Sequence, residues 1–423
     1  MVLARDGSQT QCCIVGAGPA GAMLALLLVR LGLDVVLLEK HSDFLRDFRG
    51  DDISPATIET LDELGLADDF LLLRPRLVSF VEARSTTGAT IRVADLSLLR
   101  TRFPYIAVLP QWDFLNFLTR EASRYPGFRL LMGAEATDLL EQDGVITGIR
   151  YSASGTSHEL RATLTVAADG RGSTVRDLAG LTMAMSGSPI DLLWFRLPLP
   201  PGTPEESAIT IHTGHGHAIA RINRGHYWQV ACVIPKNSAE KHRAEGIEAF
   251  RNTVLKVVPD LEGPLQALQS WEQISLLSIQ QNRLRSWYRN GLLCLGDAAH
   301  AMSPIGGVGI NFAIQDAVAA ANRLADPIRR GRVTRRQLAA VQRRRAWQVW
   351  LMQLMQARLT DGVLLASDEA TRSTTAAGRR LAGILVNQRW FLKFRSHVIA
   401  FGFQRSHVKS ERSWVPKNDG AAV

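Results

Sequence analysis

The stretch QCCIVGAGPAGAMLALLLVRLGLDVVLLEK, residues 11–40, constrains the fold more than any other part of this chain. An apolar run is followed by a glycine-rich turn, an Ala- and Leu-rich segment and a second apolar run. This pattern predicts a buried parallel strand over 12–15, a helix that ends at Gly32 and a second strand that ends at Glu39. Strand, turn, helix and strand in this order begin an α/β domain built on a parallel sheet.

The turn between the first strand and the helix has the GxGxxG pattern. The first glycine permits the tight turn, the second lets the backbone approach a pyrophosphate, and the third lets the helix pack close to the strand. A carboxylate at the end of the second strand can accept hydrogen bonds from both ribose hydroxyls. A glycine-rich turn without a ligand is the alternative. The predicted dinucleotide-binding residues are Gly16, Ala17, Gly18, Pro19, Ala20, Gly21, Glu39 and Lys40.

A second polar, glycine-rich turn lies far along the chain, in LCLGDAAHAMSPIGGVGINFAIQDA, residues 293–317. An apolar strand ends just before Asp297, which puts this carboxylate at the ligand-binding edge of the sheet. The loop from Pro304 to Asn311 contains Gly307 and Gly309, and a helix is predicted to begin near Ile310. The free N–H groups of that helix can stabilise negative charge, such as develops on a reduced flavin ring. FAD is long enough to need both turns.

The motifs GAGPAG, AADGRGSTVR and GDAAHAMSPIGGVGIN, in this order, resemble the three fingerprints of the FAD-dependent aromatic hydroxylases, the group A flavoprotein monooxygenases related to para-hydroxybenzoate hydroxylase. The resemblance implies that Asp169 and Gly170 lie near the FAD pyrophosphate and assist NAD(P)H. It also implies that Asp297 bonds the ribityl chain and that Gln111 reaches the flavin chain.

The same resemblance assigns roles close to the flavin ring. The backbone groups of Ile310 and Asn311 would meet the pyrimidine edge, and the backbone of Pro304 would face the substrate and the ring. Arg49, in FRGDDISPATIETLDELGL, would contact FAD and gate the access of NAD(P)H. Arg49 and Pro304 are therefore the expected catalytic residues. Asp51 and Asp52 depart from the small apolar residues expected after that arginine, which puts the detailed contacts there in doubt.

The order of elements predicts an interleaved architecture: a Rossmann-like FAD-binding domain, a β-sheet substrate domain inserted into it, and C-terminal helices, as in the para-hydroxybenzoate hydroxylase-like fold. The FAD-binding domain is expected at 10–77, 104–180 and 285–330, the substrate domain at 78–103 and 181–284, and the helical region at 331–423. No second GxGxxG follows Glu39, so no separate nicotinamide domain is expected.

The predicted activity is that of an FAD-dependent monooxygenase. The resemblance implies that NAD(P)H reduces the flavin, that O2 adds to give a C4a-hydroperoxyflavin, and that an electron-rich aromatic or polycyclic small molecule is hydroxylated. A reductase or dehydrogenase that acts on isoprenoid or lipid-like substrates is the alternative within enzymes, and a flavin-binding sensor without turnover is the alternative outside them. Flavin halogenases are disfavoured because their Trp-x-Trp-x-Ile-Pro pattern is absent.

Composition limits the partners. The 49 Lys and Arg exceed the 40 Asp and Glu, but eight of the arginines lie in PIRRGRVTRRQLAAVQRRRAW, which is interpreted as a solvated helix face. No zinc-finger or RNP-like pattern supports nucleic-acid binding. No secretory signal precedes Cys12, no apolar run is long enough to span a membrane, and the four cysteines have no disulfide spacing, so a cytoplasmic protein with buried free thiols is expected.

Three features leave alternatives open. The histidines at 212, 215, 217 and 226 suggest a metal site, but surface or substrate-binding roles are favoured, and no metal is expected. In the strand HYWQVACV, either the Trp228 face or the Tyr227 face covers the flavin pocket, and the nearby Arg196 either meets an anionic substrate or is solvated. Trp347, Trp350, Leu351, Leu354 and Met355 are expected to pack in the core, with a homodimer or peripheral membrane contact as alternatives.

Overall fold

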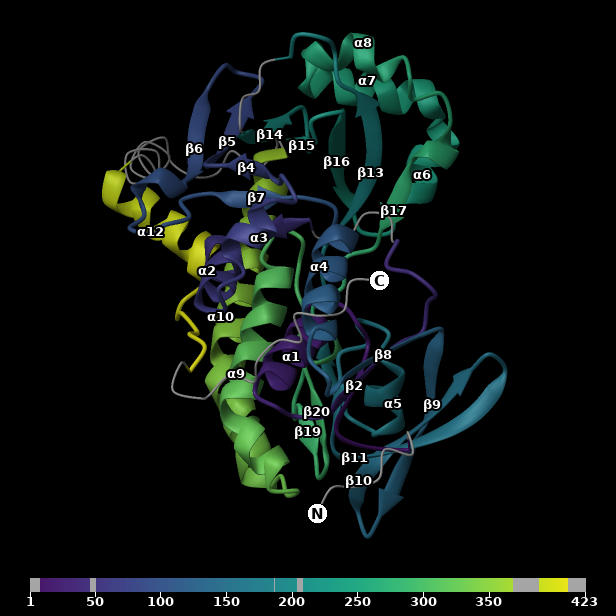
Figure 1. The fold of residues 1–423 in the computed structure, drawn as a ribbon. Coiled ribbons are helices and arrows are strands. Elements are labelled where there is room, and N and C mark those ends of the chain that lie inside the picture. Colours follow the sequence, from purple (N-terminus) through teal and green to yellow (C-terminus); the bar gives the residue numbers. More distant parts are fainter. Residues whose placement is uncertain (1–7, 46–50, 186, 204–207, 368–387, 410–423) are drawn as a thin grey trace.

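The computed structural model describes residues 8–45, 51–185, 187–203, 208–367 and 388–409. Figure 1 shows two sheet-based halves, one above the other, with the long helices α9 (Gly309–Arg329) and α10 (Arg335–Ser367) running along one side. The predicted α/β architecture with an inserted β-sheet is therefore observed.

The lower sheet contains the first predicted strands and fixes the position of both glycine-rich turns. Its main path runs β19-β20-β11-β1-β2-β8, and every pair from β20 to β8 is parallel. Residues 12–15 of β1 are fully or almost fully buried, as a central parallel strand requires. The strands are β1 (Gln9–Val15), β2 (Val35–Glu39), β8 (Phe128–Met132), β11 (Thr156–Ala167), β19 (Tyr288–Arg289) and β20 (Leu292–Cys294).

A meander extends this sheet beyond β11. The strands β9 (Ala134–Gln142) and β10 (Val145–Ala153) pair antiparallel with each other, and β10 pairs antiparallel with β11. Asp143 and Gly144, with φ of 51° and 73°, form the two-residue turn that a tight hairpin requires. The stretch GVITGIRYSASGTSHELRATLTVAADG, residues 144–170, predicts a β-meander. The pairing of these strands confirms the prediction, and Figure 1 shows the meander projecting from the lower half.

Helices α1 (Pro19–Arg30), α4 (Gln111–Ser123) and α9 pack together on this sheet. Every residue of α1 from Ala20 to Arg30 is buried, since the helix is apolar almost all round. Shorter elements complete the half, namely α2 (Pro55–Glu63), α3 (Ala67–Leu71), α5 (Thr174–Leu178) and the 3-10 turn η4 (Gly296–Ala298).

The upper sheet is built from two distant segments of the chain, in the order β17-β13-β16-β15-β14-β5-β6. The stretch LVSFVEARSTTGATIRVADL, residues 77–96, predicts a hairpin with its turn at Thr87-Gly88. This hairpin is observed and joins β5 to β6. The seven strands are β5 (Phe80–Ser85), β6 (Thr90–Asp95), β13 (Ile190–Pro198), β14 (Ala208–Gly214), β15 (His217–Asn223), β16 (Tyr227–Pro235) and β17 (Ser275–Leu277).

One face of the upper sheet is covered by its own helices. Phe195, Trp228, Val230 and Cys232 pack there against Phe250 and other residues of one core cluster. Those helices are α6 (Ala239–Glu245), α7 (Ile247–Val257) and α8 (Glu262–Leu265), with the 3-10 turns η2 (Pro259–Leu261) and η3 (Trp271–Gln273). Because side chains alternate along a strand, the Tyr227 face is the one turned toward the lower half, which resolves the alternative left open by the sequence.

Two small three-stranded sheets complete the architecture. One has the order β3-β7-β4 and the other β12-β18-β21. Their strands are β3 (Asp52–Ile53), β4 (Arg76–Val78), β7 (Ile106–Val108), β12 (Met183–Met185), β18 (Asn282–Leu284) and β21 (His300–Ala301), with the 3-10 turn η1 (Leu96–Leu98) after β6.

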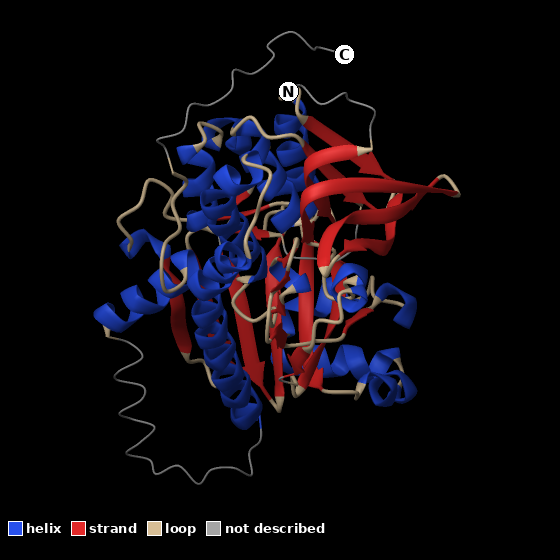
Figure 2. Ribbon diagram, turned by 90° about the horizontal axis from the view of Figure 1, so that it is seen from below, coloured by secondary structure: helices blue, strands red, loops and turns tan. Residues whose placement is uncertain are grey.

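The C-terminal part is helical, as predicted, and consists of α10 and α12 (Arg389–Phe401) among the described residues. Figure 2 shows α10 as a long helix, viewed from below. The prediction that Trp347, Trp350 and Leu354 pack in the core is wrong, because their side chains are exposed. Leu351 and Met355 are half-buried. The buried face of α10 is instead half polar. It combines Leu338, Val341, Val349 and Met352 with Arg345, Gln348, Gln353 and Gln356. Arg345, Gln353 and Gln356 find hydrogen-bond partners in the protein beside the helix.

Candidate active site

The three glycines of the first turn have the geometry that their predicted roles require. Gly16 has φ of +97°, and a Cβ there would overlap the carbonyl of Ala168 on β11. A Cβ on Gly21 would overlap the carbonyl oxygen of Gly16, so this glycine allows α1 to pack closely on the turn. A Cβ on Gly18 would have no heavy atom of the described residues within 4 Å, so this glycine faces open space. The turn is therefore sterically closed on the protein side and open where a pyrophosphate would approach.

Glu39 lies at the end of β2, beside this turn. Its Oε2 accepts the N–H of Ala17 at 3.1 Å and its Oε1 accepts the N–H of His41 at 3.1 Å. A cavity of about 380 Å³ lies here. Its lining includes Gly16, Ala17, Gly18, Glu39, Lys40, Gln111, Asp169 and Gly170. Pro19 and Ala20 follow as the first residues of α1. The structure thus brings the predicted adenylate-end residues together with those predicted from the second motif, and this donor set fits the ribose and pyrophosphate of FAD.

Asp169 stabilises the turn that follows β11. Its carboxylate accepts hydrogen bonds from the hydroxyl of Ser173 at 2.5 Å and from the N–H of Val175 at 3.1 Å. Burial raises the pKa of Asp169, although these two hydrogen bonds oppose the shift. Gly170 has φ of +84°, a conformation that favours glycine. Asp169 therefore holds the Gly170–Gly172 turn open at the edge of the cavity.

The second and third motifs meet through an ion pair. Arg171 Nε lies 3.0 Å from Asp297 Oδ2, and both side chains are partly exposed. Asp297 belongs to η4, directly after β20, at the carboxyl edge of the parallel sheet as predicted. Ligands of open α/β sheets bind at this edge, so Asp297 fits the predicted place of the ribityl chain.

The loop after β21 leads into the N-terminus of α9. The carbonyl oxygen of Pro304 accepts the N–H of Gly307 at 3.0 Å, and Gly307 has φ of +62°. The helix begins at Gly309, followed by Ile310 and Asn311, so its first N–H groups are without intrahelical partners. The side chain of Asn311 is used in hydrogen bonds within the protein. Its Oδ1 accepts the N–H of Ser54 at 3.0 Å and the hydroxyl of Thr57 at 2.7 Å. Its backbone remains the group suited to a flavin edge.

A buried ionic cluster behind this loop was not predicted. Asp316 on α9 lies 2.7 Å from Nε of Arg345 on α10 and 2.6 Å from Nε2 of His300, and it accepts the N–H of Gly296 at 3.2 Å. Burial would raise the pKa of Asp316, but His300 and Arg345 outweigh it and lower the pKa. The cluster fixes the Gly296–Asp297 turn against both helices. The solvated-face interpretation of the arginine-rich segment is therefore wrong for Arg345, whose side chain is completely buried.

Asp51 and Asp52, the residues that depart from the family pattern, lie where the two halves meet. Asp51 Oδ2 pairs with Arg224 at 2.5 Å, and Asp51 Oδ1 accepts the N–H of Gln111 at 3.3 Å. Burial raises the pKa of Asp51 to about 6, against the opposing effect of Arg224. A Cβ on Gly307 would lie 2.6 Å from Asp52 Oδ2, so Asp52 contacts the loop before α9. Burial raises the pKa of Asp52 as well. Arg49 lies outside the described residues.

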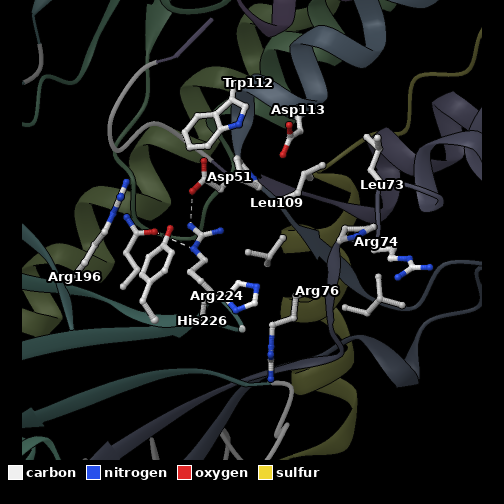
Figure 3. Close-up of a pocket in the computed structure, with 17 residues that line it drawn as sticks. Asp51, Leu73, Arg74, Arg76, Leu109, Trp112, Asp113, Arg196, Arg224 and His226 are labelled. Atoms are coloured by element: carbon white, nitrogen blue, oxygen red, sulfur yellow. Dashed lines mark hydrogen bonds and ion pairs between the residues drawn. The ribbon is translucent and has the colours of Figure 1, made fainter. Parts of the chain in front are cut away.

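A cavity of about 570 Å³ opens beside this junction, between the N-terminus of α4 and the Tyr227 face of the upper sheet. Figure 3 shows Asp51, Trp112 and Asp113 on one side of it and Arg196, Arg224 and His226 facing them. Arg74 and Arg76 lie at the β4 side. Arg196 therefore lines this cavity.

The four histidines do not form one group. His226 lines the cavity, whereas His212 is buried beside Arg221 and Asp260. Burial and the charge of Arg221 lower the pKa of His212 to about 4. Among the described residues no three His, Cys, Asp or Glu side chains form a group suited to a metal ion.

Comparison with known proteins identifies the family. A family profile described as an FAD binding domain matches residues 9–354. The 6-methylpretetramide 4-monooxygenase of Streptomyces rimosus is 31% identical over 421 residues, which cover 96% of each chain. The para-nitrophenol 4-monooxygenase of Pseudomonas sp. (strain WBC-3) is 25% identical over 341 residues, which cover 76% of this chain and 79% of the relative.

Solved structures share the fold. A probable FAD-dependent monooxygenase from Pseudomonas aeruginosa superposes with a TM-score of 0.73 at 22% identity, over 89% of this chain and 99% of the other. The anhydrotetracycline hydroxylase of Streptomyces rimosus gives a TM-score of 0.72 at 22% identity, over 93% of this chain and 76% of the other. The predicted para-hydroxybenzoate hydroxylase-like fold is thereby confirmed, as is the choice of a monooxygenase over a reductase. The chain belongs to the FAD-binding-domain family and is an FAD-dependent monooxygenase that uses NAD(P)H and O2.

Proposed function

We propose that this enzyme hydroxylates a planar polycyclic aromatic small molecule in the cavity beside Arg224. The observation that carries the proposal is the cavity itself, which lies between the FAD-binding half and the free face of the upper sheet and has Trp112 and Tyr227 in its wall. Flat aromatic walls favour planar ligands through stacking. The names of two relatives from Streptomyces rimosus support the class. One is a 6-methylpretetramide 4-monooxygenase, and the other is a 12-dehydrotetracycline 5-monooxygenase/anhydrotetracycline 6-monooxygenase.

Each group of residues has one role in binding FAD. The Gly16–Gly21 turn and Glu39 bind the adenylate end of FAD, with Lys40 beside them, and Asp169, Gly170 and Gln111 border the same cavity. Asp297 holds the ribityl chain, and the Pro304–Asn311 loop, with Gly307, Gly309 and Ile310, holds the ring. The N–H groups that begin α9 stabilise negative charge at the ring edge. Bound FAD, reduced by NAD(P)H, supplies the activated oxygen. The protein orients the substrate and excludes water.

The test combines flavin content with substrate-dependent turnover. The purified protein is expected to carry one non-covalent FAD per chain, and polycyclic phenols are expected to stimulate NADPH or NADH oxidation with equal consumption of O2. The product should gain one oxygen atom by mass spectrometry. FMN in place of FAD, or oxidation that yields only hydrogen peroxide with every polycyclic compound, would contradict the proposal.

Arg49 is proposed as the residue that guides hydride transfer, on the basis of the family resemblance. Arg49→Ala is expected to slow the reduction of the flavin by NAD(P)H more than it weakens FAD binding, because a guanidinium stabilises both the nicotinamide phosphates and the anionic reduced flavin. Stopped-flow reduction at saturating substrate measures this effect. An unchanged reduction rate would leave Arg49 without a gating role.

The cellular setting is proposed from the cysteines and the surface. All four cysteines are buried and free, which suits a reducing, cytoplasmic compartment. Among the described residues no helix is long and apolar enough to cross a membrane. Trp347 and Trp350 expose about half of their surface on α10, so we propose a homodimer through this face, with peripheral membrane contact as the second candidate. Light scattering of the Trp350→Gln variant and flotation with anionic vesicles separate the two.

A further inference from the structure

Arg224 lies on a rigid hairpin at the wall of the large cavity. Its backbone N–H donates to the carbonyl of Tyr227 at 2.9 Å, and the N–H of Gly225 donates to Asn223 Oδ1 at 2.8 Å, so the turn between β15 and β16 is fixed from within. The Arg224 side chain is only 9% exposed. A buried guanidinium on a fixed turn cannot easily move to other hydrogen-bond acceptors. Its observed hydrogen bonds therefore show which of its nitrogens are available to a ligand.

Among the described residues, two of the three guanidinium nitrogens of Arg224 have hydrogen-bond partners and the third has none. Nε donates to Gln229 Oε1 at 2.9 Å, and one terminal nitrogen pairs with Asp51 at 2.5 Å. The other terminal nitrogen, Nη1, is buried without a hydrogen-bond partner in the part of the chain that the structure describes. An unsatisfied buried donor on a charged group is costly, more so than on a neutral one. Such a cost is commonly offset when a ligand supplies the missing acceptor.

The surrounding charges favour an anion as that acceptor. Arg74, Arg76, Arg196 and Arg224 line the cavity together with His226, against the carboxyl groups of Asp51 and Asp113. Four guanidinium groups thus line the cavity with only two carboxyl groups. The cavity therefore has an excess of positive charge.

The geometry also favours a flat ligand. The Arg196 guanidinium lies 5.1 Å from the centroid of the Tyr227 ring. Trp112 lines the same cavity, and Figure 3 shows it together with Arg196. A planar group that enters between these side chains is stacked on one side and reaches arginine donors at its edge.

We propose that this cavity contains an oxyanion-binding subsite, in which Arg224 Nη1 donates to an acidic oxygen of a planar aromatic substrate and Arg196 supports it. The acidic oxygen is that of a carboxylate or of an ionised phenol or enol. The inference rests on the proposed function, since it names the substrate feature that the cavity selects. Arg224 is then a specificity-determining residue that orients the substrate.

The test measures binding to the FAD-loaded enzyme without NAD(P)H, with a matched pair of probes: 2-naphthoate, which is anionic, and 2-naphthamide, its neutral counterpart. Isothermal titration calorimetry is expected to show at least tenfold tighter binding of 2-naphthoate by the unmodified enzyme. Arg224→Gln should bring the two affinities within about twofold of each other. Arg330→Gln, which removes an exposed arginine at the end of α9, is the matched control and should leave the preference intact.

Because Arg224→Gln leaves Asp51 buried without its partner, two further variants keep the experiment decisive. Asp51→Asn retains Arg224 and should retain or strengthen the preference for 2-naphthoate. The double variant Asp51→Asn/Arg224→Gln carries no buried charge at this pair and should lose the preference while keeping its FAD content and melting temperature.

Three outcomes would overturn the inference. The unmodified enzyme could bind both probes equally, the double variant could keep the preference, or NADP⁺ could displace 2-naphthoate competitively with an affinity that depends on Arg224. The last result would assign the subsite to the dinucleotide phosphates instead. Absence of FAD or of hydroxylation would contradict the proposed function but leave the binding preference, so the two failures are distinguishable.

Discussion

Gly18 offers the sharpest separation between a glycine needed for folding and one needed for the cofactor. Its φ of −67° and ψ of −178° are angles that any residue adopts, and a Cβ there meets no heavy atom within 4 Å in the part of the chain that the structure describes. Gly18→Ala should therefore leave the apoprotein as stable as before, or stabilise it by about 0.4–1 kcal/mol, because alanine restricts the unfolded chain more than glycine does. The same methyl group would occupy the space that a pyrophosphate needs. An overpacking cost of about 1–3 kcal/mol corresponds to roughly tenfold to hundredfold weaker FAD binding.

The other two glycines of the turn should behave in the opposite way. Gly16→Ala places a Cβ at φ of +97°, which costs about 1–2 kcal/mol, and adds an overlap with Ala168 of about 1–3 kcal/mol. Gly21→Ala overlaps the carbonyl of Gly16 and should cost at least about 1–3 kcal/mol. Both variants are expected to destabilise the apoprotein.

Two measurements check this contrast. Urea unfolding of each apoprotein gives the free energy of unfolding, and titration of apoprotein with FAD, followed by flavin fluorescence, gives the dissociation constant. The reasoning would be refuted if Gly18→Ala destabilised the apoprotein as much as Gly21→Ala does, or if Gly18→Ala bound FAD with unchanged affinity.

Further predictions concern charged groups. Asp297→Ala should weaken FAD binding by about 1.5–3 kcal/mol without unfolding the chain, whereas Arg171→Ala, which removes only its ion-pair partner, should weaken it less; flavin titration of both variants checks this. Asp316→Asn should cost about 3–5 kcal/mol in urea unfolding because it leaves the Arg345 charge buried, and a loss below 1 kcal/mol would contradict the positioning role of the cluster. His212 has its pKa lowered to about 4 in the folded state, so its contribution to stability is complete above pH 6.5 and falls as the pH drops toward 4. The difference in unfolding free energy between pH 7 and pH 5 should therefore be smaller for His212→Gln than for the unmodified chain, by about 1 kcal/mol after screening by solvent.

The sequence was most informative where local chemistry dictates local structure. The GxGxxG turn, the buried run 12–15 and the carboxylate of Glu39 specified a strand, a turn and a helix together with a ligand chemistry, because each role depends on residues within about 25 positions. The hairpin at Gly88 and the meander that ends at β11 followed in the same way from alternation and turn residues.

The sequence did not predict which face of each element is buried. The spacing of Trp347, Trp350 and Leu354 on α10 is that of a core-facing stripe, yet the buried stripe contains Arg345, Gln348 and Gln353. Apolar periodicity identifies an amphipathic helix but carries no information on the polar partners that its neighbours offer. Those partners, Asp316 on α9 and backbone groups of 282, 301 and 303, come from parts of the chain that only folding brings near.

The candidate substrate site depended most on tertiary structure. Asp51 and Arg224 are 173 positions apart, and nothing in either segment indicates the other. Likewise, alternation along β16 defined two faces but not which one faces the flavin half, since that depends on where α7 and α8 pack. The sequence by itself determined the cofactor turn, the fold class and the type of chemistry, because short-range sterics and hydrogen bonding encode them. Only the tertiary structure decided which side chains line the cavity and which partners Arg224 has among the described residues. Both depend on contacts between segments that are distant along the chain.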